Sequence, residues 1–266
     1  MSKAFLVKGA CLALVALELA MLPATGLRLV LVAFTVLATL AFLAFVITSP
    51  RSQFFVPSVH ELPASSASRA VAFTFDDGPD PRTTPRVLDL LAAHGATATF
   101  FVVGKRAAAH PELVRRIAAE GHALGSHTFR HSHAFHFLSP SRARAEIEEG
   151  MEAVRAITGE PPRLFRPPQG LRTPLLRDAL SRIVGVVCVT WTERGLDTMG
   201  RSADRVVDRL SPAVREGAIL TLHDGAGLGG TDDRRPTIDA LGELLRLARE
   251  RGLRCVSLAC LAKGVG

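Results

Sequence analysis

From residue 70 onward the chain alternates short apolar segments with longer amphipathic ones, and this pattern restricts the fold more than any other feature of the sequence. The segments with strand character are residues 70–76, 97–104, 122–127, 163–167, 184–191, 217–223 and 253–258. The segments with helical periodicity are residues 83–95, 111–121, 141–157, 173–182, 202–215 and 236–251. Strands that alternate with helices of about 10–15 residues form βαβ units around a parallel sheet.

Seven such strands within about 200 residues predict an α/β fold in the form of a closed or nearly closed barrel. An open doubly wound sheet is the alternative architecture. No glycine-rich phosphate-binding fingerprint follows the first strand, which argues against a nucleotide cofactor.

Residues 29–48 form an uncharged apolar run of 20 residues, the length of a helix that crosses a bilayer. The preceding segment, residues 9–26, is also apolar but contains Glu18 and Pro23, so it spans the bilayer, lies at its interface or packs against the second helix. We expect a two-helix hairpin that remains as an anchor. The apolar run exceeds the roughly 7–15 residues of a signal peptide's core, and no clear cleavage site follows it.

The chain therefore divides into a membrane anchor (1–50), a linker rich in Ser, Ala and Pro (51–69) and an α/β domain (70–266). The basic residues flanking the two apolar segments nearly balance, which leaves the membrane orientation open; they are Lys3, Lys8, Arg28 and Arg51.

The formal net charge is +7, and the basic residues are scattered rather than grouped with aromatic ones. This distribution argues against nucleic-acid binding and suits a location near anionic lipid or cell-surface polymer. The four cysteines show no zinc-binding spacing. Cys11 lies in the first apolar segment, Cys188 and Cys255 are expected to be buried, and Cys255 with Cys260 is a candidate pair in an oxidising compartment.

Two adjacent carboxylates end the first strand, because in TFDDGP the residues Asp76 and Asp77 are followed by Gly78 and Pro79. Side chains alternate between faces along a strand, so a continuing strand would point the two carboxylates apart. The Gly-Pro turn ends the strand and lets both project at the carboxyl end of the sheet, where α/β enzymes carry their chemistry. A turn with solvated acids is the alternative interpretation.

The segment SHTFRH follows the third strand and contains His127 and His131, which would share one face if the segment were helical. Two imidazoles and one carboxylate, with positions left open for water, form a site for a divalent transition metal. The neighbouring His133 and His136 show that the segment is simply rich in histidine, so the spacing alone does not decide.

Polar residues also follow three later strands. Arg166 in FRPPQG can clamp a carboxylate, and the Pro-Pro pair would fix the next backbone N–H for an oxyanion. His223 in TLHD is a candidate general acid, and Asp197 in WTERGLD would stabilise its protonated form. Taken singly, each has a structural alternative, but together they fall on the same rim as the Asp and His motifs.

In this order and at these distances, TFDDGP, HTFRH, RPP and LTLHD resemble the motifs of the polysaccharide deacetylase family with the NodB homology domain, carbohydrate esterase family 4. The resemblance covers about residues 69–262 and implies a distorted (β/α)7 barrel of NodB type, here preceded by transmembrane helices. It implies that Asp77, His127 and His131 hold a divalent metal, usually zinc, with cobalt, nickel and iron(II) as other candidates. It also implies that Asp76 is the general base and that Arg166 orients it.

The same resemblance implies that the backbone N–H of Gln169 stabilises the oxyanion and that His223, tuned by Asp197, protonates the leaving amine. Further candidates for contact with the substrate or the oxyanion are Pro168, Trp191 and Leu222. Trp191 is also compatible with a core position. Gln169 stands where the family commonly has Tyr, and the WTERGLD motif departs from the family pattern, so Arg194 and Asp224 are candidates to share the role of Asp197.

The activity implied is removal of N-acetyl groups from an amino sugar of a cell-envelope glycan by a metal-dependent amidohydrolase. The candidate substrates are peptidoglycan, an exported polymer and a lipid-linked saccharide. The alternatives are deformylation of a lipid-linked amino sugar and a non-catalytic glycan-binding module. We expect an anchor in a bacterial inner membrane and a periplasmic or extracellular domain. Four histidines are expected to be structural or superficial: His60, His94, His110 and His122.

Overall fold

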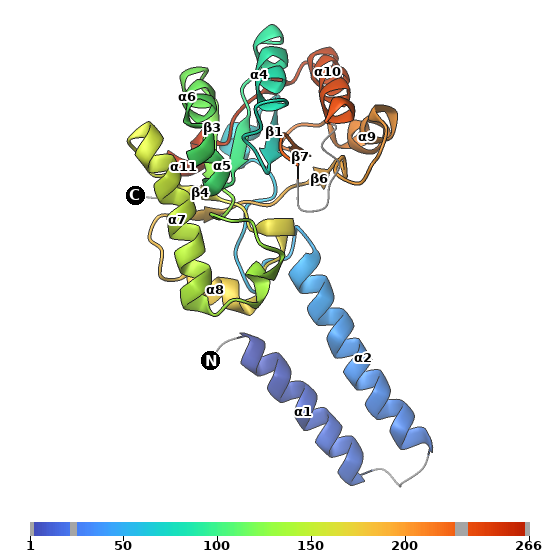
Figure 1. The fold of residues 1–266 in the computed structure, drawn as a ribbon. Helices are drawn as coiled ribbons and strands as arrows, with labels where there is room; N and C mark the ends of the chain where they lie inside the picture. The colour runs from blue at the N-terminus through green and yellow to red at the C-terminus, as the bar shows by residue number, and fades with distance from the viewer. Residues whose placement is uncertain (1–2, 22–25, 227–233, 264–266) are drawn as a thin grey trace.

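The structure is a computed structural model that describes residues 3–21, 26–226 and 234–263. It consists of an α/β domain and a long helical hairpin that projects from one end of it (Figure 1). The outer limits of the expected anchor and domain, residues 1 and 266, and the predicted break at Pro23 lie outside the described residues.

Seven strands lie side by side in the order β5-β4-β3-β2-β1-β7-β6, and an eighth pairs with β1 beside this path. The strands are β1 (Ala70–Asp76), β2 (Thr99–Val102), β3 (Ala123–Ser126), β4 (Leu164–Phe165), β5 (Val187–Cys188), β6 (Glu193–Arg194), β7 (Ile219–His223) and β8 (Arg254–Cys255). All their pairings are parallel. The central strand β1 is buried along its whole length, and its register sets Asp76 beside His223 of β7.

The two edges of the sheet are joined by one stretch of chain. β5 pairs with β4 at one edge and β6 pairs with β7 at the other, although only residues 189–192 separate them. The Val189 N–H donates to Phe165 O, and the Thr192 N–H donates to Ile219 O. Of the strand expected at 184–191, only Val187–Cys188 pairs as a strand, and the short strand β6 that follows it was not predicted, because the chain changes neighbours as it crosses the gap. The predicted distorted barrel is confirmed, and the open-sheet alternative is wrong.

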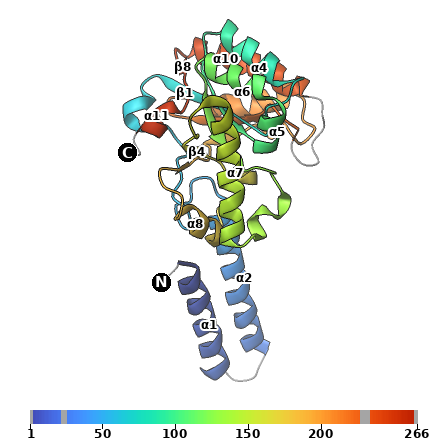
Figure 2. The same ribbon diagram turned by 60° about the vertical axis from the view of Figure 1, so that its left-hand side comes forward.

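Helices cover the outside of the barrel (Figures 1 and 2). They are α3 (Ala64–Ala67), α4 (Thr84–Ala93), α5 (Gly104–Ala109), α6 (Pro111–Ala119), α7 (Pro140–Thr158), α8 (Pro174–Leu180), α9 (Ala203–Leu210), α10 (Arg235–Glu250) and α11 (Ala259–Lys263). Five of them, α4, α6, α7, α8 and α10, have a proline in the first turn, where no backbone donor is needed. The sequence did not predict α5, whose GKRAAA segment is too short to show a helical period.

The two N-terminal helices, α1 (Lys3–Met21) and α2 (Gly26–Thr48), form an antiparallel hairpin. By length and composition both can cross a membrane, and their side chains are largely exposed. The Thr35 hydroxyl donates to Glu18 Oε1 at 2.7 Å, so the one acid of α1 is bound by the partner helix. The described part of residues 9–26 packs against the second helix, which is one of the three arrangements considered.

The stretch expected as a linker is packed against the barrel. Phe55 and Val56 are 2% and 3% exposed, and Val59 pairs with Val189 of the segment that closes the barrel. α2 ends directly against this region, where Val46 joins the same apolar cluster as Phe55. α2 and the barrel are therefore connected without a flexible spacer.

Arg172 holds this junction together. Its side chain is 1% exposed and donates to the carbonyls of Ser49, Pro50 and Ser52 and to the Ser58 hydroxyl. Its backbone N–H donates to Ile47 O in the last turn of α2. The backbone N–H of Arg172 thus satisfies a carbonyl that the end of the helix leaves free, and its buried guanidinium satisfies the carbonyls of the segment that follows.

Candidate active site

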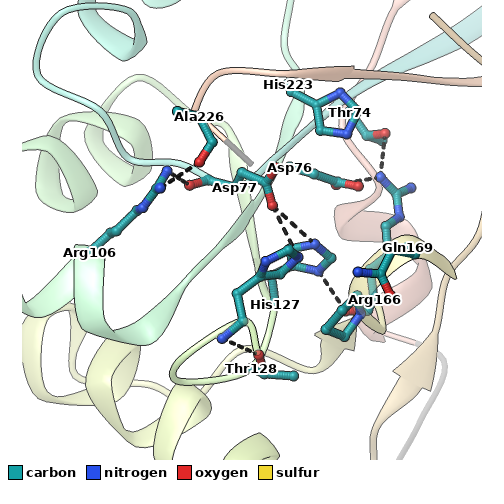
Figure 3. Close-up of polar contacts among 12 residues, drawn as sticks. Thr74, Asp76, Asp77, Arg106, His127, Thr128, Arg166, Gln169, His223 and Ala226 are labelled. Carbon is teal, nitrogen blue, oxygen red and sulfur yellow. Dashed lines mark hydrogen bonds and ion pairs between the residues drawn. The ribbon is translucent and has the colours of Figure 1, made fainter. Parts of the chain in front are cut away.

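Asp76 and Asp77 stand at the carboxyl end of β1, as predicted, and both are nearly buried at 4% and 5% exposed. Asp77 has a φ of 72°, in the left-handed region, so the chain turns sharply after Asp76 and both carboxylates face one cavity (Figure 3). Arg106 stabilises this turn by donating to Asp77 O and Ala226 O, each at 2.5 Å. Sequence reasoning missed Arg106, because its partners are backbone atoms that no motif reveals.

Arg166 is fully buried and donates to Asp76 Oδ1 at 2.7 Å. It also donates to the Thr74 hydroxyl at 2.8 Å and to the Thr190 carbonyl at 2.8 Å. Its guanidinium lies over the Phe101 ring at 4.1 Å from the centroid. Burial lowers the pKa of Arg166, against the charge and hydrogen bond of Asp76, which raise it. The predicted pairing of Arg166 with Asp76 is present in the structure.

His127 and His131 converge on Asp77. Their Nε2 atoms lie 3.5 and 3.2 Å from Asp77 Oδ1, and their ring centroids are 4.7 Å apart. The segment that carries them is a loop and not a helix, so a helical face does not explain the convergence. Instead, Thr128 and His131 adopt positive φ values of 67° and 52°, and the His131 N–H donates to the Thr128 hydroxyl.

These three residues fit a divalent metal. One ligand atom from each lies within 4.8 Å of the others, and Asp77 Oδ1 is buried without a hydrogen-bond partner among the described residues. His127 Nδ1 lies 2.7 Å from Arg166 O, so it donates there and leaves Nε2 as the ligand atom. Burial lowers the pKa of both imidazoles, that of His127 to about 3, and the neutral form is the one that binds metal.

His223 and Asp197 form a second buried pair. His223 Nδ1 lies 2.8 Å from Asp197 Oδ1, and Asp197 Oδ2 accepts from the His223 N–H and the Thr237 hydroxyl. Burial alone would lower the pKa of His223, but the charge and hydrogen bond of Asp197, with Asp77 and Asp76, raise it to about 9. Among the residues that the structure describes, Asp197 is thus the acid that bonds to His223. Asp224 instead accepts a hydrogen bond from the Thr84 hydroxyl.

Gln169 lies in a tight turn at the rim of the cavity, with a φ of 51°. His136 holds this turn, since its Nε2 lies 2.9 Å from Pro168 O and 3.1 Å from Gln169 Oε1. Gln169 Nε2 lies 3.2 Å from His133 Nδ1, and His133 also lines the cavity. The sequence offered only a histidine-rich segment, and the support that His136 gives to the turn depends on contacts across more than 30 residues.

The predicted residues surround a cavity of about 460 Å³. Its lining residues are Asp76, Asp77, His127, His131, His133, Gln169, Trp191, Arg194, Leu196, Thr198, Met199, Thr221 and His223. Trp191 is only 6% exposed yet forms part of the wall, so both of its predicted roles apply. It packs so closely on Gly170 that an added Cβ there would lie 2.2 Å from the indole.

Leu222 requires a correction. We expected it to contact the substrate, but its side chain is fully buried in the apolar cluster beneath the helices and is not part of the cavity wall. The reason is strand alternation, because its neighbours Thr221 and His223 point to the cavity. Pro168 is also buried and contributes its carbonyl to the His136 contact. Cys255 and Cys260, the candidate pair, are free thiols.

The fold and site define the class of the protein, a parallel α/β barrel with a candidate mononuclear metal centre at the carboxyl ends of its strands. The profile of the family described as polysaccharide deacetylase matches residues 64–184. A chitooligosaccharide deacetylase of Bradyrhizobium sp. is 38% identical over 194 residues, covering 70% of this chain and 88% of that protein. A peptidoglycan-N-acetylglucosamine deacetylase of Bacillus cereus is 34% identical over 196 residues, covering 73% and 89%.

Among solved structures, the peptidoglycan deacetylase PdaC from Bacillus subtilis matches with a TM-score of 0.65 at 29% identity, covering 73% of this chain and 90% of that chain. The chain belongs to the polysaccharide deacetylase family, carbohydrate esterase family 4, and is a carbohydrate deacetylase by membership.

Replacing His127 with alanine tests the candidate metal centre. We expect zinc or cobalt affinity to fall by more than about 100-fold, because even partners of metal ligands are worth about 10–100-fold. Metal content after dialysis measures the effect, and circular dichroism checks that the variant is folded. His94→Ala, on the exposed end of α4, is the matched control and should keep its metal. Full metal content in His127→Ala would show that the assigned cluster is not the metal site.

Proposed function

We propose that this chain is a membrane-anchored, divalent-metal-dependent hydrolase that removes N-acetyl groups from an amino sugar of the cell envelope. One arrangement carries the proposal. A carboxylate held by a buried arginine and an imidazole held by a buried aspartate flank the Asp-His-His cluster in one cavity. Relatives named as peptidoglycan and chitooligosaccharide deacetylases support an N-acetylated glycan as the substrate.

Asp77, His127 and His131 would hold the metal, for which zinc is our first candidate because of the two imidazoles and one carboxylate. The bound ion would supply Lewis-acid activation of the attacking water and of the amide carbonyl. Cobalt, nickel and iron(II) accept the same ligand set.

Asp76 is the proposed general base. Arg166 binds its Oδ1 and fixes the carboxylate, while no described residue bonds Oδ2, which can accept a proton from the water. The water oxygen attacks the acetyl carbon. The backbone N–H of Gln169, at the rim of the cavity, is the proposed donor to the resulting oxyanion.

His223 is the proposed general acid. Its pKa of about 9, raised against burial by Asp197, keeps it protonated at neutral pH. It gives its proton to the amide nitrogen as the C–N bond breaks, so that acetate and a free amine leave the cavity.

The hairpin supports a membrane anchor, since the start of α1 and the end of α2 lie at the same end as the barrel (Figure 1). We propose a bacterial inner membrane with the barrel on the periplasmic or extracellular side, where envelope glycans are exposed.

The activity is tested with the full chain in detergent, stripped of metal and resupplied with zinc or cobalt. We expect acetate release from N-acetylglucosamine oligomers or peptidoglycan only after metal is restored.

Asp76→Asn should keep the metal and lose at least about 100-fold in kcat, the lower range for removing a general base. Formate release from a formylated lipid-linked sugar, without acetate release, would support the deformylase alternative. Metal-loaded protein silent on all three substrates would favour the binding-module alternative.

Asp197→Asn tests the assignment of the acid. Activity requires protonated His223, so it is present below the pKa of His223 and lost above it. Without the aspartate charge, burial lowers that pKa, and we expect the alkaline limb of kcat to move down by more than about one pH unit. Asp208→Asn, exposed on α9, should leave the profile unchanged. If Asp197→Asn is slower but its alkaline limb does not move, Asp197 does not control the protonation of His223.

The membrane side is tested by labelling single cysteines with an impermeant maleimide, in a chain whose four cysteines are replaced by alanine. Ser181→Cys, exposed beside α8, should react in cells with a permeabilised outer membrane, whereas Arg28→Cys near the turn of the hairpin should not. The opposite pattern would put the barrel in the cytoplasm. The paired helices change the count of flanking charges, because Lys3, Lys8 and Arg51 then stand at one end against Arg28 at the other, and this count favours the cytoplasmic side.

A further inference from the structure

A second hollow adjoins the catalytic cavity and reaches the end of the membrane helix. It has a volume of about 650 Å³ and is formed partly by residues 48–51, which are the last residue of α2 and the three that follow it. Gln169, Trp191 and Arg194 line both spaces, so the hollow and the cavity adjoin at these three residues. We call this hollow the junction groove.

The junction groove is held close to the bilayer. α2 has 23 residues and is about 34 Å long, enough to cross the roughly 30 Å hydrocarbon core and end at its surface. Arg172 then binds the carbonyls directly after the helix, and Val46 is packed against the barrel. Because no spacer separates α2 from the barrel, the groove stays at the level of the lipid headgroups.

The junction groove is positively charged. Three arginines and one glutamate line it, and Arg209 donates to that glutamate, Glu193, at 2.5 Å. Arg51 and Arg194 are exposed, and neither has an acidic side chain within ion-pair distance in the part of the chain that the structure describes. The Arg194 guanidinium lies over the Trp191 ring, 5.6 Å from its centroid, at the boundary with the catalytic cavity.

Two unpaired guanidiniums beside a membrane surface match a phosphate group that belongs to a lipid. A neutral polysaccharide would need aromatic faces and hydrogen-bond partners along its path, and of the groove residues only Trp191 is aromatic. A long polymer would also have to enter the headgroup layer to reach the groove.

We infer that the substrate is a membrane-embedded glycolipid in which the N-acetylated amino sugar is joined to its lipid through phosphate. The sugar enters the catalytic cavity, the phosphate binds Arg51 and Arg194 in the junction groove, and the lipid chain lies along α2. This inference rests on the proposed function, because it names the substrate class of the same catalytic site.

The chain carries its own reporter for the test. Trp191 is its only tryptophan, and it has no tyrosine, so its fluorescence reports on the wall between groove and cavity. The metal-loaded full chain, in nanodiscs of phosphatidylcholine, is titrated with polyprenyl phosphate, with the uncharged polyprenol and with phosphatidylglycerol. We expect a saturable change in Trp191 emission with polyprenyl phosphate only.

Arg51→Gln should raise the midpoint of this titration about tenfold, the loss expected for one charge-assisted contact. Arg177→Gln is the matched control, since Arg177 is also exposed, lies on α8 and has no ion pair among the described residues. It should leave the midpoint unchanged. An equal response to polyprenol, an equal response to phosphatidylglycerol, or the same midpoint in Arg51→Gln would overturn the inference.

A kinetic comparison separates this inference from the proposed function. For polyprenyl-phosphate-linked N-acetylglucosamine, Arg51→Gln should lower kcat/KM about tenfold more than it does for a soluble N-acetylglucosamine oligomer. Hydrolysis of the oligomer with no response of Trp191 to polyprenyl phosphate would refute the inference alone. A specific Trp191 response without hydrolysis of either substrate would refute the deacetylase and leave the phosphate site in place.

Discussion

The contact between Arg166 and Asp76 is the one on which the rest of the site depends. Two adjacent carboxylates end a buried strand, and like charges in a low-dielectric interior repel strongly. The fully buried Arg166 compensates the charge of Asp76. The charge of Asp77 would be compensated by a cation bound to the Asp-His-His cluster. Breaking one partner of such a buried pair costs about 3–5 kcal/mol, because the remaining charge is left without compensation.

The same arginine links the separate parts of the barrel. Its carbonyl accepts from His127 Nδ1, and its guanidinium reaches the carbonyls of Val189 and Thr190, in the segment that closes the sheet. The proposed base, one proposed metal ligand and the closure of the barrel therefore all contact Arg166, through its side chain or its backbone. Replacing the Arg166 side chain would alter the orientation of Asp76, whereas the tautomer of His127 depends on the backbone carbonyl of the same residue.

Strained backbone is concentrated at the cavity. Asp77, His131 and Gln169 all line it and all have positive φ values, although none is glycine. Each such residue costs about 1–3 kcal/mol and persists only where its surroundings determine it. Arg106 supplies the support for Asp77, the Thr128 hydroxyl for His131, and His136 for Gln169. The strain in these turns lowers the stability of the fold, and the same turns direct the three side chains into the cavity.

The sequence predicted the order of strands and helices because β1 and the long helices have clear apolar periods, and it predicted Asp76, Asp77, His127 and His131 as neighbours because they follow strands of one parallel sheet. It did not predict that the strand expected at 184–191 is reduced to β5, that β6 follows as a separate short strand, or that a loop carries the histidines. Those features depend on which neighbours a segment meets in space. The contacts of Arg106 and His136 with backbone carbonyls are likewise invisible in a local pattern.

The contacts of Arg172 at the junction between α2 and the barrel can restrict which substrates reach the catalytic cavity. The barrel itself resembles those of relatives named for polymeric glycans, so the catalytic residues alone do not select between a polymer and a lipid-linked sugar. We infer that the position of the cavity relative to the membrane selects between these two kinds of substrate. A barrel on a flexible linker could reach glycan far from the membrane, whereas in the proposed membrane-anchored arrangement a barrel fixed by Arg172 to the last turn of α2 keeps its site beside the lipid surface. With the site fixed there, a substrate that is itself anchored in the bilayer meets it by diffusion in two dimensions, and the unpaired cations of the groove lie where its phosphate would pass.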